Sequence, residues 1–213
     1  MSDSVDRSRW RRIETQQALT ELVGEPLPAV RDKVRPALAE RHIEWLAASP
    51  FCVLATADDE GNCDASPKGD PAGSLVTVLD ATTIAIAERP GNRRVDGYHN
   101  VLRNPHVGLI FVVPGRGDTL RINGRAGLVD QAPFLDEMAV RGKRPILALV
   151  VDIDEVFFHC SKAFLRSKLW QPEQWHPDQL PERAQLAKEL ERPEAEIGDL
   201  RRHYGPRYAD HLY

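Results

Sequence analysis

Between residues 50 and 160, short apolar segments alternate with turn residues, and this alternation constrains the fold more than any other feature. Strands joined by tight turns are typical of antiparallel sheets, because parallel strands need a longer crossover. With about seven such segments and few helices between them, a closed or nearly closed antiparallel barrel fits better than a parallel βαβ sheet. The segments are FCVLATA, NCDASPK, GSLVTVLD, TTIAIAE, HVGLIFVV, TLRINGRAGLV and PILALVVDIDEVFFHC.

Helix-like patterns precede this region. Residues 16–24 predict a helix that stops at Gly24. A proline-rich connector leads to a second predicted helix within residues 35–49, with Pro36 near its first turn. The apolar residues of this second helix, at roughly helical spacing, are Leu38, Ile43, Trp45 and Leu46.

Short helices are also predicted inside the strand region and after it. The segment RPGNRRVDGYHNVLRNP predicts a loop and then a short helix that stops at Asn104 and Pro105. APFLDEMAV predicts another short helix, and residues 161–213 have the charge mix of solvated helices. The predicted division is a helical extension at 1–48, a barrel domain at 49–175 and a helical tail at 176–213.

The composition excludes several classes of function. The formal net charge of −4 gives no support to a nucleic-acid partner. The three cysteines have no CxxC spacing, so neither a disulfide framework nor a metal site is predicted. No apolar run approaches the roughly 20 residues that span a bilayer, and the N-terminal residues lack the apolar core of a signal peptide. We therefore expect a cytoplasmic protein with no membrane segment.

The segment SPKGD ends the second predicted strand and is the first candidate binding site. Ser66 and Lys68 lie two apart, so their side chains project from one face of a strand. A hydroxyl and an ammonium group on one face can hold a phosphate. A solvated hairpin edge explains the same five residues. The phosphate-loop patterns GxxxxGK[ST] and GxGxxG do not occur here.

Two further basic segments are candidates for anion binding. Arg89, Arg93 and Arg94 lie within six positions, next to a glycine and just before a predicted helix whose N-terminal amides favour an anion. Such a cluster is also compatible with a solvated face. In HCSKAFLRSKLW, the side chains of Lys162, Arg166 and Trp170 would lie along one side of a helix and could cover an aromatic, negatively charged ligand. The alternative is a surface helix whose tryptophan packs on the barrel. Arg121 and Arg125 would share a strand face of unassigned role.

In this order, four segments resemble the FMN-binding split-barrel family related to pyridoxamine 5′-phosphate oxidase, and more narrowly a bacterial flavin-nucleotide-binding subgroup. The resemblance covers about residues 45–175. Its most characteristic piece is an Asn-Pro pair followed by a VGLIF-type strand, after an arginine-rich helix start. The segments are FCVLATADDEGNCDASPKGD, RPGNRRVDGYHNVLRNPHVGLIFVVPG, LRINGRA and VFFHCSKAFLRSKLW.

This resemblance implies a six-stranded split barrel that forms a homodimer, with two FMN molecules in grooves between the subunits. The flavin phosphate would contact the second strand and the basic segment after the fourth. The partner subunit would add residues from its later strands and C-terminal segment. The implied cofactor-binding residues are Ser66, Lys68, Asn92, Arg93, Arg94 and Asn100, with Arg121, Lys162, Arg166 and Trp170 as the matching positions from the later segments.

The implied activity is hydride or electron transfer at the flavin, from an unidentified substrate or a reduced nicotinamide donor, with no catalytic side chain assigned. The substrate-recognition segment that ends the true oxidase has no match here, which leaves oxidation of vitamin B6 compounds open. Two alternatives remain: a non-catalytic flavin carrier or sensor whose C-terminal helices bind another protein, and a haem-binding split barrel with His99 or His106 as axial ligand.

Overall fold

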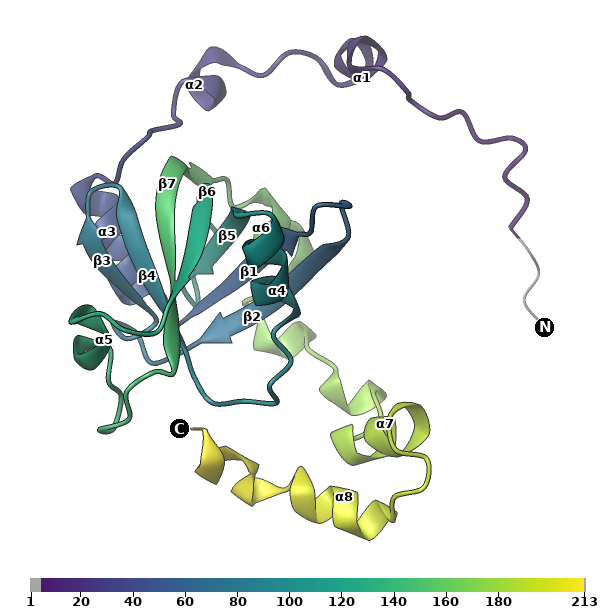
Figure 1. The fold of residues 1–213 in the computed structure, drawn as a ribbon. Helices are drawn as coiled ribbons and strands as arrows, with labels where there is room; N and C mark the ends of the chain where they lie inside the picture. The colour runs from purple at the N-terminus through teal and green to yellow at the C-terminus, as the bar shows by residue number, and fades with distance from the viewer. Residues whose placement is uncertain (1–4, 213) are drawn as a thin grey trace. The chain divides into compact units, whose positions relative to one another are not determined.

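The computed structural model describes residues 5–212, except for the side chain of His211. It divides into two compact units, Met1–Val34 and Arg35–Tyr213 (Figure 1). In the first unit, α1 (Gln16–Val23) ends as predicted at Gly24, whose positive φ of 87° suits a glycine. The proline-rich connector contains one helical turn, α2 (Pro28–Arg31), with its proline in the first turn.

The second unit is built on a seven-stranded sheet in which every strand pair is antiparallel. The predicted antiparallel split barrel is confirmed, with seven strands in place of the six that the resemblance implied. Along the sheet the order is β2-β1-β5-β6-β7-β4-β3, so β2 and β3 are its two edges. The strands are β1 (Phe51–Ala57), β2 (Cys63–Gly69), β3 (Val76–Asp80), β4 (Thr83–Glu88), β5 (His106–Val112), β6 (Thr119–Val129) and β7 (Leu147–His159).

Alternation along the strands places one apolar face inside the barrel. In β1 the buried positions are Cys52, Leu54 and Thr56, and β5 repeats the same pattern. Burying this face supplies most of the favourable free energy of folding. The large, fully buried side chains include Leu54, Ile84, Ile86, Leu109, Phe111, Leu120, Ile122, Leu149 and Val151.

Helix α3 (Glu40–Ala48) packs against the sheet and adds Trp45 and Leu46 to the core. It is shorter than predicted. Because it begins at Glu40, Pro36 lies ahead of it rather than in its first turn, and Ile43 is 40% exposed instead of joining the core.

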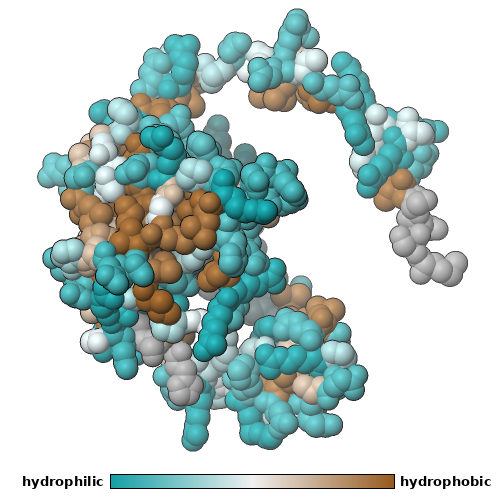
Figure 2. Space-filling view, in the orientation of Figure 1, coloured by the Kyte–Doolittle hydropathy of each residue, from teal (hydrophilic) through white to brown (hydrophobic). Residues whose placement is uncertain are grey.

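Two further helices were predicted and occur within the barrel region. Helix α4 (Asp96–Arg103) stops just before Pro105 and packs on β1, β2 and β6. Helix α5 (Phe134–Glu137) covers the outer surface of β4 and β7 through Leu135. Hydrophobic residues gather over β3, β4 and β7 on the side of the barrel seen in Figure 2.

Beyond β7 the chain is helical, as its pattern predicts. A small apolar core of Ala184, Ala187 and Leu200 joins the two longest of these helices. Among residues 5–212, no helix has both the length and the apolar character needed to cross a bilayer. The elements are α6 (Lys162–Ser167), η1 (Pro172–Gln174), η2 (Pro177–Gln179), α7 (Arg183–Leu190), α8 (Ile197–His203) and η3 (Pro206–His211), where η marks a 3-10 helix.

Gly124 gives a test of this fold. It lies where the register of β6 and β7 shifts, and a Cβ atom there would overlap the backbone carbonyl of Asp152. We expect Gly124→Ala to lower the free energy of unfolding by about 3 kcal/mol, because backbone must move. Gly127→Ala, on the same strand with open space around it, is the control and should change stability by less than about 1 kcal/mol. Equal effects in urea denaturation would contradict the register described here.

Candidate functional site

One face of β2 carries the polar side chains of SPKGD into the molecule. Asp64, Ser66 and Lys68 are half-buried, while the residues between them are exposed. They lie opposite the buried Thr56, Leu54 and Cys52 of β1. The prediction that Ser66 and Lys68 share one face is therefore confirmed.

The loop after β4 brings a second polar segment to the same place. The side-chain oxygen of Asn92 accepts a hydrogen bond from the backbone N–H of Arg94 at 2.9 Å, which shapes this loop as an Asx turn. The two segments enclose a cleft of about 340 Å³, named here the β2–α4 cleft. Its lining residues are Asp64, Ala65, Ser66, Pro67, Lys68, Glu88, Asn92, Arg94 and Asp96.

Three groups of the β2–α4 cleft that could bind an anion, the side chains of Ser66, Lys68 and Arg94, are each in contact with a carboxylate of the same chain. The hydroxyl of Ser66 donates to Asp64 at 2.8 Å. The ammonium of Lys68 contacts Glu88 at 2.7 Å, and the guanidinium of Arg94 contacts Asp96 at 2.5 Å. Two cations therefore face three carboxylates, and none of these acids was predicted as a site residue.

Glu88 is the most firmly held of the three carboxylates. Its Oε2 atom also accepts a hydrogen bond from the hydroxyl of Tyr98 at 2.6 Å. Burial, and then the hydrogen bond to Glu88, raise the pKa of Tyr98 well above its ordinary value, so its proton is retained. The Lys68 ammonium lies 4.5 Å from the centre of the Tyr98 ring, within cation–π range.

The N-terminus of α4 borders the β2–α4 cleft, and Gly97 permits its close approach. A Cβ atom at Gly97 would lie 3.1 Å from a carboxylate oxygen of Asp64, 3.4 Å from the Thr56 hydroxyl and 3.7 Å from the Ser66 hydroxyl. The first turn of a helix carries partial positive charge. This end of the cleft therefore favours an anion, in opposition to the acids around it.

Arg89 and Asp70 form a buried ion pair beside the β2–α4 cleft. Arg89 Nε lies 2.7 Å from Asp70 Oδ2, and the exposed fractions of the two side chains are 11% and 2%. A second guanidinium nitrogen donates to the Met138 carbonyl at 2.9 Å. Arg89, which the sequence grouped with the anion-binding arginines, thus joins the ends of β2 and β4 to the segment after α5.

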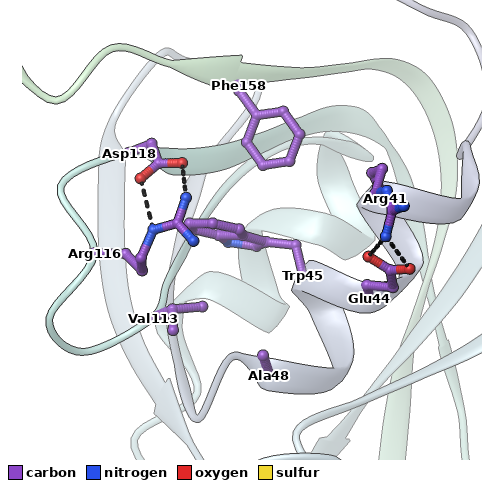
Figure 3. A pocket seen from close by; sticks show the side chains of 8 residues that line it. All are labelled: Arg41, Glu44, Trp45, Ala48, Val113, Arg116, Asp118 and Phe158. Atoms are coloured by element: carbon purple, nitrogen blue, oxygen red, sulfur yellow. Dashed lines mark hydrogen bonds and ion pairs between the residues drawn. The ribbon is translucent and has the colours of Figure 1, made fainter.

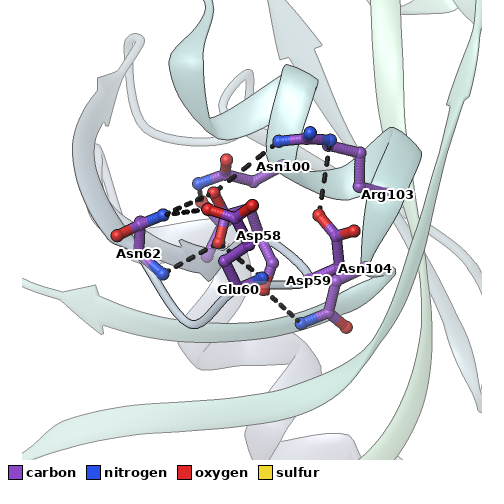
Figure 4. Close-up of polar contacts among 8 residues, drawn as sticks. Asp58, Asp59, Glu60, Asn62, Asn100, Arg103 and Asn104 are labelled. Atoms are coloured by element: carbon purple, nitrogen blue, oxygen red, sulfur yellow. Dashed lines mark hydrogen bonds and ion pairs between the residues drawn. The ribbon is translucent and has the colours of Figure 1, made fainter.

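Two other predicted site residues lie outside the lining of the cleft. Arg93 is exposed and adopts a positive φ of 64°. Asn100 donates to the Thr56 hydroxyl at 3.1 Å. Figure 4 shows Asn100 in a polar group at the β1–β2 turn, where Asp58 accepts hydrogen bonds from Asn62 and Arg103 contacts the neighbouring acids.

The residues predicted from the later segments are spread over other surfaces. Arg121 donates to Asn123 on the outer face of β6, and Lys162 and Arg166 are exposed on α6. The prediction that Trp170 continues the side of that helix is wrong, because the helix ends at Ser167 and Lys168 takes a left-handed conformation. The indole N–H of Trp170 instead donates to the Arg116 carbonyl at 2.6 Å.

A second cavity, of about 410 Å³, lies beside α3 and contains none of the predicted site residues (Figure 3). Trp45, Phe158 and Val113 supply apolar walls. Two ion pairs flank them and leave the lining neutral: Arg41 with Glu44, and Arg116 with Asp118. The complete lining is Arg41, Glu44, Trp45, Ala48, Val113, Arg116, Asp118 and Phe158.

The β2–α4 cleft can hold a phosphate through a hydroxyl, an ammonium, a guanidinium and an amide that come from two segments 20 or more residues apart. The acids that oppose these groups were missed by sequence reasoning. Strand alternation could have found Asp64, which is two residues before Ser66. Glu88 and Tyr98 meet Lys68 only through the tertiary fold.

One comparison with known proteins identifies a family. The sequence profile described as pyridoxamine 5′-phosphate oxidase matches residues 38–160, which contain all seven strands. No curated protein matches the chain.

Several solved structures resemble part of the chain. A proposed pyridoxamine 5′-phosphate oxidase from Lactobacillus delbrueckii is 24% identical, covers 58% of this chain and 95% of its own, and has a TM-score of 0.46. HupZ from Group A Streptococcus is 17% identical, covers 57% of this chain and 93% of its own, and has a TM-score of 0.45. An FMN-binding protein from Syntrophomonas wolfei is 13% identical, covers 55% of this chain and 88% of its own, and has a TM-score of 0.42.

The buried ion pair next to the cleft gives a second testable prediction. We expect Asp70→Asn to lower the free energy of unfolding by about 3 kcal/mol, because it removes the charged partner of a buried guanidinium. Asp136→Asn, which breaks the exposed pair with Arg144, is the control and should cost at most about 1 kcal/mol. Equal losses of unfolding free energy in the two variants, measured by thermal unfolding, would show that the buried Arg89–Asp70 pair stabilises the fold no more than an exposed pair does.

Proposed function

Because the chain belongs to the pyridoxamine 5′-phosphate oxidase family, we propose that it is an FMN-binding oxidoreductase. The observation that carries the proposal is the β2–α4 cleft, where Ser66 and Lys68 from β2 meet Asn92 and Arg94 from the loop after β4. A phosphate monoester carries close to two negative charges at neutral pH. Two cations, a hydroxyl and a helix N-terminus complement that charge.

In this proposal the residues of the cleft bind and orient the cofactor. Ser66, Lys68 and Arg94 hold the phosphate, and Asn92 keeps the loop in the shape that presents Arg94. When bound, the flavin supplies hydride or electron transfer. Burial raises the pKa of the Cys52 thiol to about 12, so this thiol, opposite Lys68, stays protonated and is no nucleophile.

The proposed function also includes an oligomeric state, a cellular location and an electron donor. We propose a homodimer in which the partner subunit supplies Arg121, Lys162 and Arg166 to the flavin; all three lie away from the cleft of their own chain. We also propose a cytoplasmic location, because the three cysteines have no CxxC spacing and reduced thiols are the rule in that compartment. A reduced nicotinamide is the proposed electron donor.

Removing the two cations of the cleft tests the phosphate site. Lys68→Ala combined with Arg94→Ala should weaken FMN binding by about 100-fold, since two charge-assisted contacts are lost. Riboflavin, which has no phosphate, should bind the natural protein and this double variant with equal affinity. The matched control is Lys143→Ala with Arg144→Ala, which removes the same charge from an exposed turn. Flavin fluorescence titration measures both ligands, and unchanged FMN affinity in the double variant would refute the site.

The enzymatic part is tested on the FMN-loaded protein. Addition of NADH or NADPH should bleach the flavin absorption, and air should restore it. A bound flavin that neither donor reduces would support the non-catalytic carrier instead. A haem absorption band in the purified protein, with no flavin, would overturn the cofactor assignment.

The dimer makes a separate prediction. If residues of the partner complete the site, dilution below the dimer dissociation constant should release FMN together with the loss of dimer. Analytical ultracentrifugation with detection at flavin wavelengths follows both species. A monomer that binds FMN as tightly as the dimer would show that one chain is sufficient.

A further inference from the structure

We propose that Glu88 sets the phosphate affinity of the β2–α4 cleft: it is an internal counter-anion that competes with the phosphate of a ligand for Lys68. This inference rests on the proposed function, because it concerns the same cleft. It assigns a role to Glu88, whose negative charge repels an anionic ligand. The result is a cleft that binds a phosphate group weakly, so that a phosphate ester needs contacts from the rest of its body for stable binding.

The contacts of Lys68 carry the first step. Its ammonium lies 2.7 Å from Glu88, and the exposed side-chain fractions of the two residues are only 16% and 20%. An ion pair so shielded from water is stronger than one on the surface. An incoming phosphate must therefore share Lys68 with a carboxylate that is already in contact with it.

The second step is that Glu88 cannot easily turn away. The Tyr98 hydroxyl donates to the same carboxylate oxygen that Lys68 contacts. Tyr98 is itself buried, with 4% of its surface exposed, and keeps its proton because its pKa is raised. A ligand that displaces Glu88 would leave a desolvated carboxylate behind, which is costly. Glu88 therefore stays near any bound phosphate and repels it.

Asp96 is the instructive contrast in the same cleft. It contacts Arg94, but the exposed fractions of these two side chains are 45% and 78%. Solvent screens such a pair, and both groups can move apart at little cost. Asp96 should therefore affect phosphate affinity much less than Glu88 does.

The weakened phosphate contact determines what else a ligand must supply. Two cations without opposing acids would bind any small phosphate, whatever else the molecule carried. With Glu88 in place, the phosphate alone binds weakly. Additional contacts, such as those of a flavin ring, are then needed for stable binding.

Glu88→Gln tests the proposal, since it keeps the size and the acceptor of the side chain while removing its charge. The dissociation constants of inorganic phosphate and of FMN should both fall about tenfold, the effect of one nearby unit charge in a partly solvated cleft. That of riboflavin should not change. Asp96→Asn is the matched control and should lower the two phosphate constants by less than about threefold. Phosphorus NMR measures phosphate binding, and fluorescence titration measures the flavins.

Each outcome decides one question. Unchanged constants for phosphate and FMN in Glu88→Gln would overturn the inference, and so would an equal change for riboflavin, which would mean that Glu88 acts through the fold. If phosphate binding tightens but the natural protein binds no FMN, the inference holds and the proposed function fails. Should Glu88→Gln not fold, as judged by circular dichroism, Glu88→Ala removes the same charge and carries the same expectations.

Discussion

Two neighbouring ion pairs join the end of β2 to the end of β4, and the geometry of the candidate site depends on them. In the described sheet, β2 is an edge strand whose only strand partner is β1, so its far side must be held by side chains. Lys68 contacts Glu88, and Asp70 contacts Arg89. The residues of the segment SPKGD therefore have two different roles. Asp70 holds the strand end within the fold, while Ser66 and Lys68 face the β2–α4 cleft.

This arrangement puts the structural and the ligand-binding charges side by side. Arg89 is buried and directed toward Asp70 and the Met138 carbonyl. Arg94, five residues later, is exposed and borders the cleft. Proximity in an arginine cluster thus says little about role. What separates the two is burial, because a guanidinium shielded from water needs fixed partners within the protein.

Much of the fold could be predicted from the sequence, because strand alternation and turn residues are local signals. The same period of two placed Ser66 and Lys68 on one face. The prediction of a continuous helix through Trp170 was wrong because Lys168 adopts a left-handed conformation that ends the helix. Glycine is the usual sequence signal for such an end, and none is present here. Glu88 was missed for a different reason: its contact with Lys68 joins residues 20 positions apart, and no local pattern encodes such a pairing.

The pairing of each cation of the cleft with a carboxylate also bears on how the chain folds. Ser66, Lys68 and Arg94 each have a carboxylate partner from their own chain. Within the cleft, therefore, no uncompensated positive charge opposes folding of the ligand-free chain. Under the proposed function, folding therefore does not depend on the cofactor. A newly synthesised chain can reach its native barrel first and acquire its ligand later, whenever the supply in the cell allows.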